Sequence, residues 1–487
     1  MATFSEKVLL GLKVRQLRQE LQLAFTDLSV RSGLSVSYLN EIEKGKKYPR
    51  DEKLHLLAQS LHTSPEWLRS ADPGPHLAPV AALLQSNFLN ELPLELFGID
   101  PGRLLEMLAA APLQVNAFVI SLVELAQHHA VGTDHFYLSA MRAFQELNNN
   151  YFPELEAAAK ACRAEYGLSN VACDVSSLKR ILINHFGLRI HSNGLSAYPE
   201  LSHLRSVYIP KSKELLLNPK MTEEQLLFQL AKEIGFQYQG LQPRPYASTV
   251  LTVTSFEQVS NNFKAGYFAV ALLIDEWEFL SKLETAFNSP SFDPSIMLQW
   301  LEHYRVSPDI LFQRFNVISV HWGLDAVFFH RLVYNKADDH YLIDKELHLH
   351  RVDRQYAGRP NEHYCRRWLS SRLIQTLSKD GASGPITGMV KMQYAGSDQS
   401  WLCLGIARAS AFRPGEWSGL MIGVLINAAS ENRFQFMNDQ SIPIDTVGMT
   451  CERCGIQDCQ ERGAPPYVLE KWQKKQRIKD RIKALTG

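Results

Sequence analysis

The chain has 487 residues, a length that predicts about three domains and excludes a single ordinary one. Its hydrophobic fraction of 45% and charged fraction of 21% are typical of a globular protein able to build several cores. Lysine plus arginine equals aspartate plus glutamate, 51 against 51, so the overall charge indicates no partner and any nucleic-acid surface must be local.

The sequence lacks the patterns of secreted and membrane-spanning proteins. Residues 1–16 are charged and contain no apolar stretch that ends in a small-residue cleavage site. The most apolar run, 420–429, is shorter than the roughly 20 residues that cross a bilayer. We therefore expect a cytoplasmic protein with no membrane partner, in which clustered thiols hold metal or do redox chemistry more often than they form disulfides.

Residues 1–70 combine a local positive charge with a series of short helices. They hold 11 basic and 8 acidic side chains, a net charge of +3 in a neutral chain. Gly33 is expected to end the second helix because a sharp turn needs a positive φ, and Ser35 is expected to cap the third. Apolar spacing places the helices at 8–21, 26–33, 35–44 and 51–61.

A glycine-bearing turn between two short helices is the plan of the helix-turn-helix. The stretch SGLSVSYLNEIEKGKKYP closely resembles the lambda-repressor and Cro-like class, and the resemblance covers roughly Lys7 to Leu68. It implies that the helix from Ser35 to Lys44 lies in the major groove of double-stranded DNA. The class often has glutamine where this chain has Phe25, which puts that one contact in doubt. A small helical module for protein interaction is the alternative interpretation.

The resemblance also assigns candidate DNA contacts. Early residues of the third helix would face base edges, and a threonine and three lysines around it would meet phosphates. The candidates are Thr26, Ser35, Val36, Ser37, Tyr38, Asn40, Lys44, Lys46 and Lys47.

The middle of the chain divides into two predicted regions. Residues 75–168 are rich in alanine, leucine and glutamate and predict a helical linker or dimerisation region. Residues 169–320 predict a helix, a strand, two strands around a turn and further helices. This order resembles the ImmA/IrrE class of zinc metallopeptidases, whose active helix reads HExxH.

The zinc ligands of that class are missing from this sequence. The two histidine positions of the motif are Lys232 and Phe236, and only Glu233 of the motif remains. The segment that supplies the third ligand offers Asn262 and Lys264, neither of them a carboxylate. We therefore expect a degenerate peptidase-like domain of α+β type that is no enzyme and suits the binding of a small molecule.

Residues 321–487 predict a sensory domain of α+β type. A helix is expected to begin at Asn361 and to end near Gly381, and 322–334 is expected to run from a helix into a strand. Two strands are expected on either side of the polar turn at 395–400, and 412–429 fits a turn followed by either a helix or a buried strand.

A cysteine cluster near the C-terminus is the strongest chemical motif of this region. Cys451, Cys454 and Cys459 occupy one short stretch, CERCGIQDC, and C-x2-C lets two thiolates reach one metal. Every histidine lies at or before His363, so a fourth ligand must be remote, and Cys365 and His363 are the candidates. A [4Fe-4S] cluster suits three local thiols at least as well as zinc, and a loop of buried thiols is the third alternative.

Together, these parts resemble the short-chain fatty acyl-CoA regulator family of bacterial transcription factors. SYLNEIEKGKKYP and CERCGIQDC are the most specific stretches. The resemblance implies control of short-chain fatty-acid genes, a short-chain acyl-CoA as effector, and a homodimer on a pseudo-palindromic operator. Some members of the family hold an iron–sulfur cluster at the corresponding cysteines. A redox or iron sensor without an acyl-CoA effector, and a zinc metallopeptidase that cleaves a repressor, are the rival hypotheses.

Overall fold

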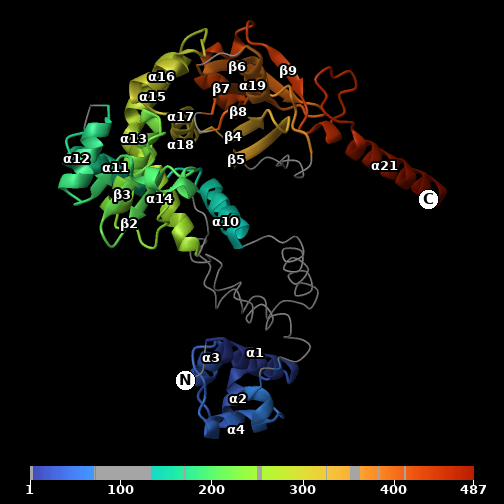
Figure 1. Ribbon diagram of the computed structural model, residues 1–487. Coiled ribbons are helices and arrows are strands. Elements are labelled where there is room, and N and C mark those ends of the chain that lie inside the picture. The colour runs from blue at the N-terminus through green and yellow to red at the C-terminus, as the bar shows by residue number, and fades with distance from the viewer. Residues whose placement is uncertain are drawn as a thin grey trace. The chain divides into compact units, whose positions relative to one another are not determined.

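The structure is a computed structural model, and its chain forms two compact units that we describe separately (Figure 1). One unit is Met1–Phe144 with Thr252–Phe256, and the other is Gln145–Leu251 with Glu257–Gly487. Most of the predicted linker at 75–168 lies outside the described residues. The structure describes residues 4–70, 72, 133–168, 172–248, 255–324, 326–350, 362–380, 384–410 and 413–486.

The N-terminal part of the first unit is a bundle of short helices. The predicted helices are confirmed, with a short fifth one after them. A core of leucines, isoleucine and valine joins them, including the fully buried Leu28, Leu39 and Ile42. The helices are α1 (Phe4–Glu20), α2 (Phe25–Ser32), α3 (Val36–Glu43), α4 (Asp51–Ser60) and α5 (Pro65–Arg69).

The second unit begins with helices around a small sheet. Its three strands are β1 (Arg189–His191), β2 (Ser206–Ile209) and β3 (Glu214–Leu217), ordered β1-β3-β2 with β1 parallel to β3. The helices are α11 (Pro153–Glu165), α12 (Val175–Asn184), α13 (Glu223–Tyr238), α14 (Phe256–Leu273), α15 (Glu276–Phe287), α16 (Ile296–Tyr304), α17 (Pro308–Arg314) and α18 (Asn316–His321), while α10 (Thr133–Leu147) precedes them at the boundary of the units.

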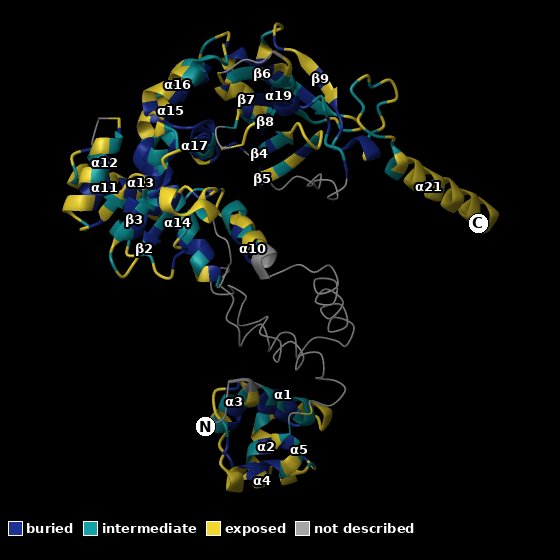
Figure 2. Cartoon of the chain, viewed as in Figure 1, coloured by how far each residue is buried: buried dark blue, intermediate teal, exposed yellow. Residues whose placement is uncertain are grey.

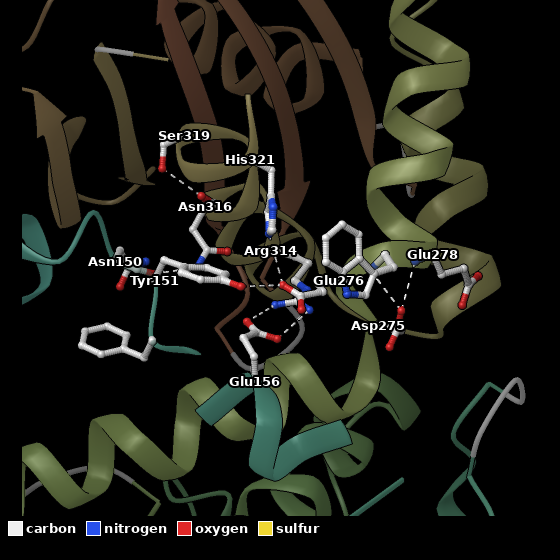
Figure 3. A network of polar contacts seen from close by, with 12 residues as sticks. Asn150, Tyr151, Glu156, Asp275, Glu276, Glu278, Arg314, Asn316, Ser319 and His321 are labelled. Carbon is white, nitrogen blue, oxygen red and sulfur yellow. Dashed lines mark hydrogen bonds and ion pairs between the residues drawn. The ribbon is translucent and has the colours of Figure 1, made fainter. Parts of the chain in front are cut away.

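A buried polar network joins helices of this unit that are distant in the sequence (Figure 3). The Arg314 guanidinium donates to both carboxylate oxygens of Glu156 at 2.6 and 3.0 Å, which ties α17 to α11. Tyr151 and His321 both contact the Glu276 carboxylate, at 2.9 and 3.3 Å. Removing one partner of such a pair leaves a buried charge unpaired, so this network specifies how the helices pack.

A larger sheet follows, with the strand order β5-β4-β8-β7-β6-β9. All neighbours are antiparallel except β6 and β9. The predicted stretch 412–429, which fitted either a helix or a buried strand, contains a strand over Glu416–Leu425. The strands are β4 (Ala326–Asn335), β5 (His340–His350), β6 (Ile386–Tyr394), β7 (Ser400–Ala409), β8 (Glu416–Leu425) and β9 (Ile444–Val447), and the helices are α19 (Leu369–Asp380), α20 (Ala428–Arg433) and α21 (Tyr467–Thr486).

Two predicted boundaries in this region are wrong. The helix expected from Asn361, a residue outside the described ones, begins at Leu369, because Tyr364 forms a β-bridge with Thr450 instead. The chain after Trp322 does not start in a helix, since α18 ends at His321 and β4 begins at Ala326. At Tyr364 a long-range pairing prevails over the local helical pattern.

Helix α21 has 20 residues and differs in its burial from the other long helix of the second unit, α14, which has 18. Figure 2 shows it exposed along its whole length, and none of its residues is buried. It carries seven lysines and arginines against Glu470 and Asp480. None of the described helices combines the length and the apolar composition that would let it span a membrane.

Glycines let α19 lie directly on the large sheet. A methyl group at Gly419 of β8 would lie 2.7 Å from the Ser370 carbonyl oxygen, closer than side-chain carbons approach. Methyl groups at Gly388 and Gly405 would press on Leu369 and Leu373 at 3.0–3.2 Å. The helix is therefore closer to the strands than any larger residue would permit.

We predict that Gly419→Ala lowers the free energy of unfolding by roughly 1–3 kcal/mol, because the added carbon must displace backbone. Urea denaturation followed by tryptophan fluorescence measures the change. Gly384→Ala is the matched control, since a methyl group there meets nothing within 4 Å and its φ is not positive. Equal stability of Gly419→Ala and the natural chain would show that α19 has room to spare.

Candidate functional site

The turn between α2 and α3 has the geometry predicted from the sequence. Gly33 ends α2 in the left-handed region with φ 68°. Ser35 then caps α3, and its Oγ accepts the backbone N–H of Tyr38 at 3.3 Å. These two residues fix the direction in which α3 leaves the turn, as a recognition helix requires.

The predicted DNA contacts lie on the accessible side of this turn and helix. Leu39 and Ile42 point into the core, so the opposite face of α3 is free for a groove. Tyr38 and Asn40 are half-buried, and Lys47 forms an ion pair with Glu41 at 2.7 Å. The exposed candidates are Thr26, Ser35, Val36, Ser37, Lys44, Lys46 and Lys47.

A buried ion pair that the sequence analysis did not predict holds α3 against α1. Arg18 of α1 donates to both oxygens of Glu43 at 2.6 and 2.9 Å. The same guanidinium lies 4.2 Å from the centre of the Phe25 ring. Phe25 is therefore a packing residue at the start of α2. An acidic residue on the apolar side of a predicted helix was the signal that could have revealed Glu43.

The cysteines come together at the other end of the chain, in the second unit. Cys451, Cys454, Cys459 and Cys365 line one small cavity. The structure thus brings the predicted remote cysteine to the local three. His363 does not line this cavity, and its ring and backbone N–H contact the Glu452 carboxylate instead.

Backbone pairing carries Cys365 to this cavity. Tyr364 and Thr450 form an antiparallel bridge. On either side of it, the Cys365 N–H donates to the Met449 carbonyl at 3.0 Å and the Cys451 N–H to the His363 carbonyl at 2.8 Å. Cys365 therefore lies in an extended segment, so the helical geometry assumed for it in the sequence analysis does not apply.

Side-chain hydrogen bonds, two of them to the buried Glu362 from an exposed arginine, brace the two paired segments. The Glu362 carboxylate accepts the Thr450 hydroxyl at 2.7 Å and both arms of the Arg453 guanidinium at 2.7 and 2.8 Å. Arg462 donates to the carbonyls of Cys451, Cys454 and Ile456, which closes the cysteine loop on itself. Neither arginine was predicted as part of the site.

Backbone N–H groups point at two of the sulfurs. The Gly448 N–H donates to Cys365 Sγ at 3.4 Å, and the Gly463 N–H donates to Cys451 Sγ at 3.2 Å. Burial raises the pKa of the Cys365 thiol to about 11, and backbone hydrogen bonds oppose that rise. Such bonds favour thiolates and tune the sulfurs of iron–sulfur clusters.

Gly448 also makes room for Cys454. A methyl group at this glycine would lie 2.7 Å from Cys454 Sγ. As the side chains stand, no three cysteine, histidine, aspartate or glutamate residues of the described chain converge on one metal position. The donor set fits a thiolate-held metal, because four sulfurs line one cavity and two of them already accept N–H groups.

A larger cavity of about 360 Å³ adjoins the cysteine cavity, and the two share Arg366 and Glu461. Tyr334 and Tyr341 lie on its wall as a stacked pair with ring centres 4.6 Å apart. Lys336 and Lys379 add two cations, and Asp339 and Glu461 two carboxylates. The cavity thus combines a flat aromatic wall with charges of both signs.

The positions of the degenerate zinc motif also come together. Lys232 Nζ donates to Asn262 Oδ1 at 2.7 Å, so two of the three expected ligand positions are in contact. Both Glu233 oxygens accept the Arg244 guanidinium, at 2.8 and 2.6 Å, and both side chains are 4% exposed. Arg244 in turn lies 3.7 Å from the centre of the Phe236 ring. Lys264 does not line the pocket that these residues form.

Comparison with known proteins supports the helix-turn-helix site in the first unit. Residues 14–68 match the helix-turn-helix family model HTH_3. No curated protein matches the chain. A solved structure, that of a Mycobacterium tuberculosis transcriptional regulator, matches 66% of this chain and 92% of its own with 17% identity and a TM-score of 0.48. The helix-turn-helix match indicates a DNA-binding regulator of transcription.

We predict that two changes in the first unit act differently on DNA binding. Asn40→Ala should cost about 1–3 kcal/mol on a duplex selected from a random pool and little on unrelated DNA, because the amide would read a base. Lys46→Ala should weaken binding to both kinds of DNA. It should also lower the slope of log affinity against log salt concentration by about one, because it removes one phosphate contact.

Fluorescence anisotropy over a range of salt concentrations measures both quantities. Lys220→Ala is the control, since Lys220 is an exposed lysine of the second unit. If Asn40→Ala bound every duplex like the natural chain, the assignment of α3 as the base-reading helix would be wrong.

Proposed function

We propose that this regulator belongs to the short-chain fatty acyl-CoA regulators, responds to a short-chain acyl-CoA and holds an iron–sulfur cluster. One observation carries the proposal: the cysteine cavity and the 360 Å³ cavity share Arg366 and Glu461. A ligand in the larger cavity would thus lie against the cysteine loop. The proposed regulator acts in the cytoplasm on short-chain fatty-acid genes.

The cysteine cavity supports a [4Fe-4S] cluster, with zinc as the alternative. Cys451, Cys454, Cys459 and Cys365 would be the ligands. Fe–S clusters of this type are held by four thiolates, and N–H groups on the sulfurs set their potential. When bound, the cluster would supply one-electron redox chemistry. The protein's part is to hold the loop and the extended segment at 362–365 together.

The larger cavity supports the acyl-CoA assignment. Coenzyme A carries phosphates and an adenine ring, which need cations and a flat apolar surface. Arg366, Lys336 and Lys379 offer the cations, and the stacked tyrosines Tyr334 and Tyr341 offer the surface. A volume of about 360 Å³ suits part of the molecule, with the remainder outside.

We propose that the regulator acts as a homodimer and that the effector changes the relative placement of its two DNA-binding domains. Such domains bind half-sites about one DNA turn apart. Helix α21 exposes Trp472, Ile478, Ile482 and Leu485, a set of apolar side chains available to a second copy. Regulation requires that acyl-CoA bind the two placements with different affinity.

We propose no enzymatic activity. Lysine and phenylalanine occupy both histidine positions of the peptidase motif, and the remaining Glu233 is bound by Arg244 through both oxygens. A general base must have an oxygen free to accept a proton from water. A zinc metallopeptidase is therefore disfavoured. A redox or iron sensor that uses the same four cysteines without an acyl-CoA is the second candidate.

For the cluster, we predict that anaerobic reconstitution with iron and sulfide gives a brown protein with about four iron atoms per chain. Cys365→Ala should lose most of this iron, because it removes the one remote ligand. Iron and sulfide analysis with an absorbance spectrum measures the loss. Cys403→Ala is the control, since Cys403 is buried in β7 away from the cavity. A colourless protein loaded with zinc would contradict the cluster.

For the effector, we predict that Arg366→Ala and Lys379→Ala each weaken acyl-CoA binding by about 1.5–3 kcal/mol, the worth of a hydrogen bond to a charged group. Calorimetric titration with acetyl-CoA and propionyl-CoA measures this, with Lys474→Ala on exposed α21 as control. DNA affinity of reconstituted and apo protein, each with and without acyl-CoA, then separates the candidates. A response to the cluster alone would favour the redox sensor.

A further inference from the structure

The pocket around Lys232 contains a positive charge that forms no ion pair with a carboxylate of the described residues. Lys232 Nζ donates to Asn262 Oδ1, a neutral oxygen, at 2.7 Å. The neighbouring carboxylate, Glu233, is bound by Arg244 through both oxygens and by Gln237 at 2.7 Å. Lys232, Arg244 and Glu233 line the pocket together, which gives it a net charge of +1.

More cations act on the same lysine from other parts of the second unit. Burial lowers the pKa of Lys232 to about 8, and the charges of Arg244, Lys345 and Arg205 act in the same direction. Only Glu233 opposes them. Lys345 and Arg205 lie near one buried carboxylate, Asp309, which also pairs with Arg331 and Arg408. Asp344 pairs with Arg331, and Glu224 with Arg408. Around Lys232, cations therefore outnumber carboxylates.

The rest of the pocket offers hydrogen bonds and a small volume. Ser206 and Gln229 are buried on its wall, and the Ser206 hydroxyl donates to Gln229 Oε1 at 3.2 Å. Tyr246, half of whose surface is exposed, marks the side that meets solvent. The volume of about 20 Å³ is that of about one water molecule, so the pocket can take in only the head of a small ligand and excludes a nucleotide.

We propose that this pocket binds the oxyanion head of a small carboxylate or phosphate, which pairs with Lys232. An ammonium group has three donors, and Asn262 uses one of them. An oxyanion would use the others and restore the missing negative charge. The bound group would lie beside α13, which carries Lys232, against the wall formed by Ser206, Gln229 and Arg244. This site is separate from the cysteine cavity and requires neither a cluster nor an acyl-CoA.

The test is thermal unfolding of the full chain in sodium acetate, sodium phosphate and sodium chloride at equal ionic strength and pH 7. Acetate or phosphate should raise the unfolding midpoint saturably by roughly 2–4 °C, because only the folded state has the pocket. Comparing acetate with phosphate distinguishes a carboxylate ligand from a phosphate ligand. Lys232→Met should show no saturable rise, and Lys211→Met, a change of an exposed turn residue, should respond like the natural chain.

The rise should also vanish at pH 9.5, because Lys232 loses its proton above about 8 and no longer attracts an anion. Line broadening of ¹³C-labelled acetate at pH 7 and pH 9.5 measures binding to the natural chain directly and so needs no variant. Equal responses of Lys232→Met and the natural chain, or a rise that never saturates and is the same in chloride, would overturn the proposal. So would the absence of acetate or phosphate binding at pH 7.

Discussion

The pairing of two short segments, 363–365 and 449–451, determines whether a four-cysteine site exists at all. Three cysteines share one loop, but the fourth comes from a segment far earlier in the chain, which the bridge between Tyr364 and Thr450 pairs with the loop. Two backbone hydrogen bonds and the Glu362 carboxylate secure that bridge. Because one bridge alone is a weak contact, the ion pair of the buried Glu362 with Arg453 and the contacts of His363 with Glu452 strengthen the placement of Cys365.

Local signals in the sequence were sufficient wherever a turn or cap decided the structure. Gly33 with its positive φ and Ser35 at the start of α3 could both be predicted, because each acts on its nearest neighbours. The helix expected from Asn361 was wrong because the backbone of 363–365 pairs with residues distant in the sequence, which no local pattern reveals. Likewise, β8 is a strand because β4 and β7 flank it on both sides, and its composition alone fits a helix equally well.

Arginine–carboxylate pairs, each with a buried carboxylate, were the largest omission. Arg18 with Glu43, Arg314 with Glu156, Arg244 with Glu233 and Arg453 with Glu362 each form two hydrogen bonds. Their partners lie 25, 158, 11 and 91 positions apart, so spacing could not reveal them. Each pair fixes one element against another, which a fully apolar contact would do less specifically. The candidate cysteine ligands, in contrast, could be predicted because they share one loop.

The bond between Arg244 and Glu233 also determines what substitutions in this pocket could achieve. Histidines placed at 232 and 236 would rebuild the two ligands of the motif, yet the carboxylate between them would stay engaged through both oxygens. The guanidinium also rests on the ring of Phe236 and on that of Tyr208. Exchanging Phe236 would thus unsettle the arginine without freeing the acid. Engineering a metal into this pocket would therefore require replacing Arg244 as well as the residues at 232 and 236.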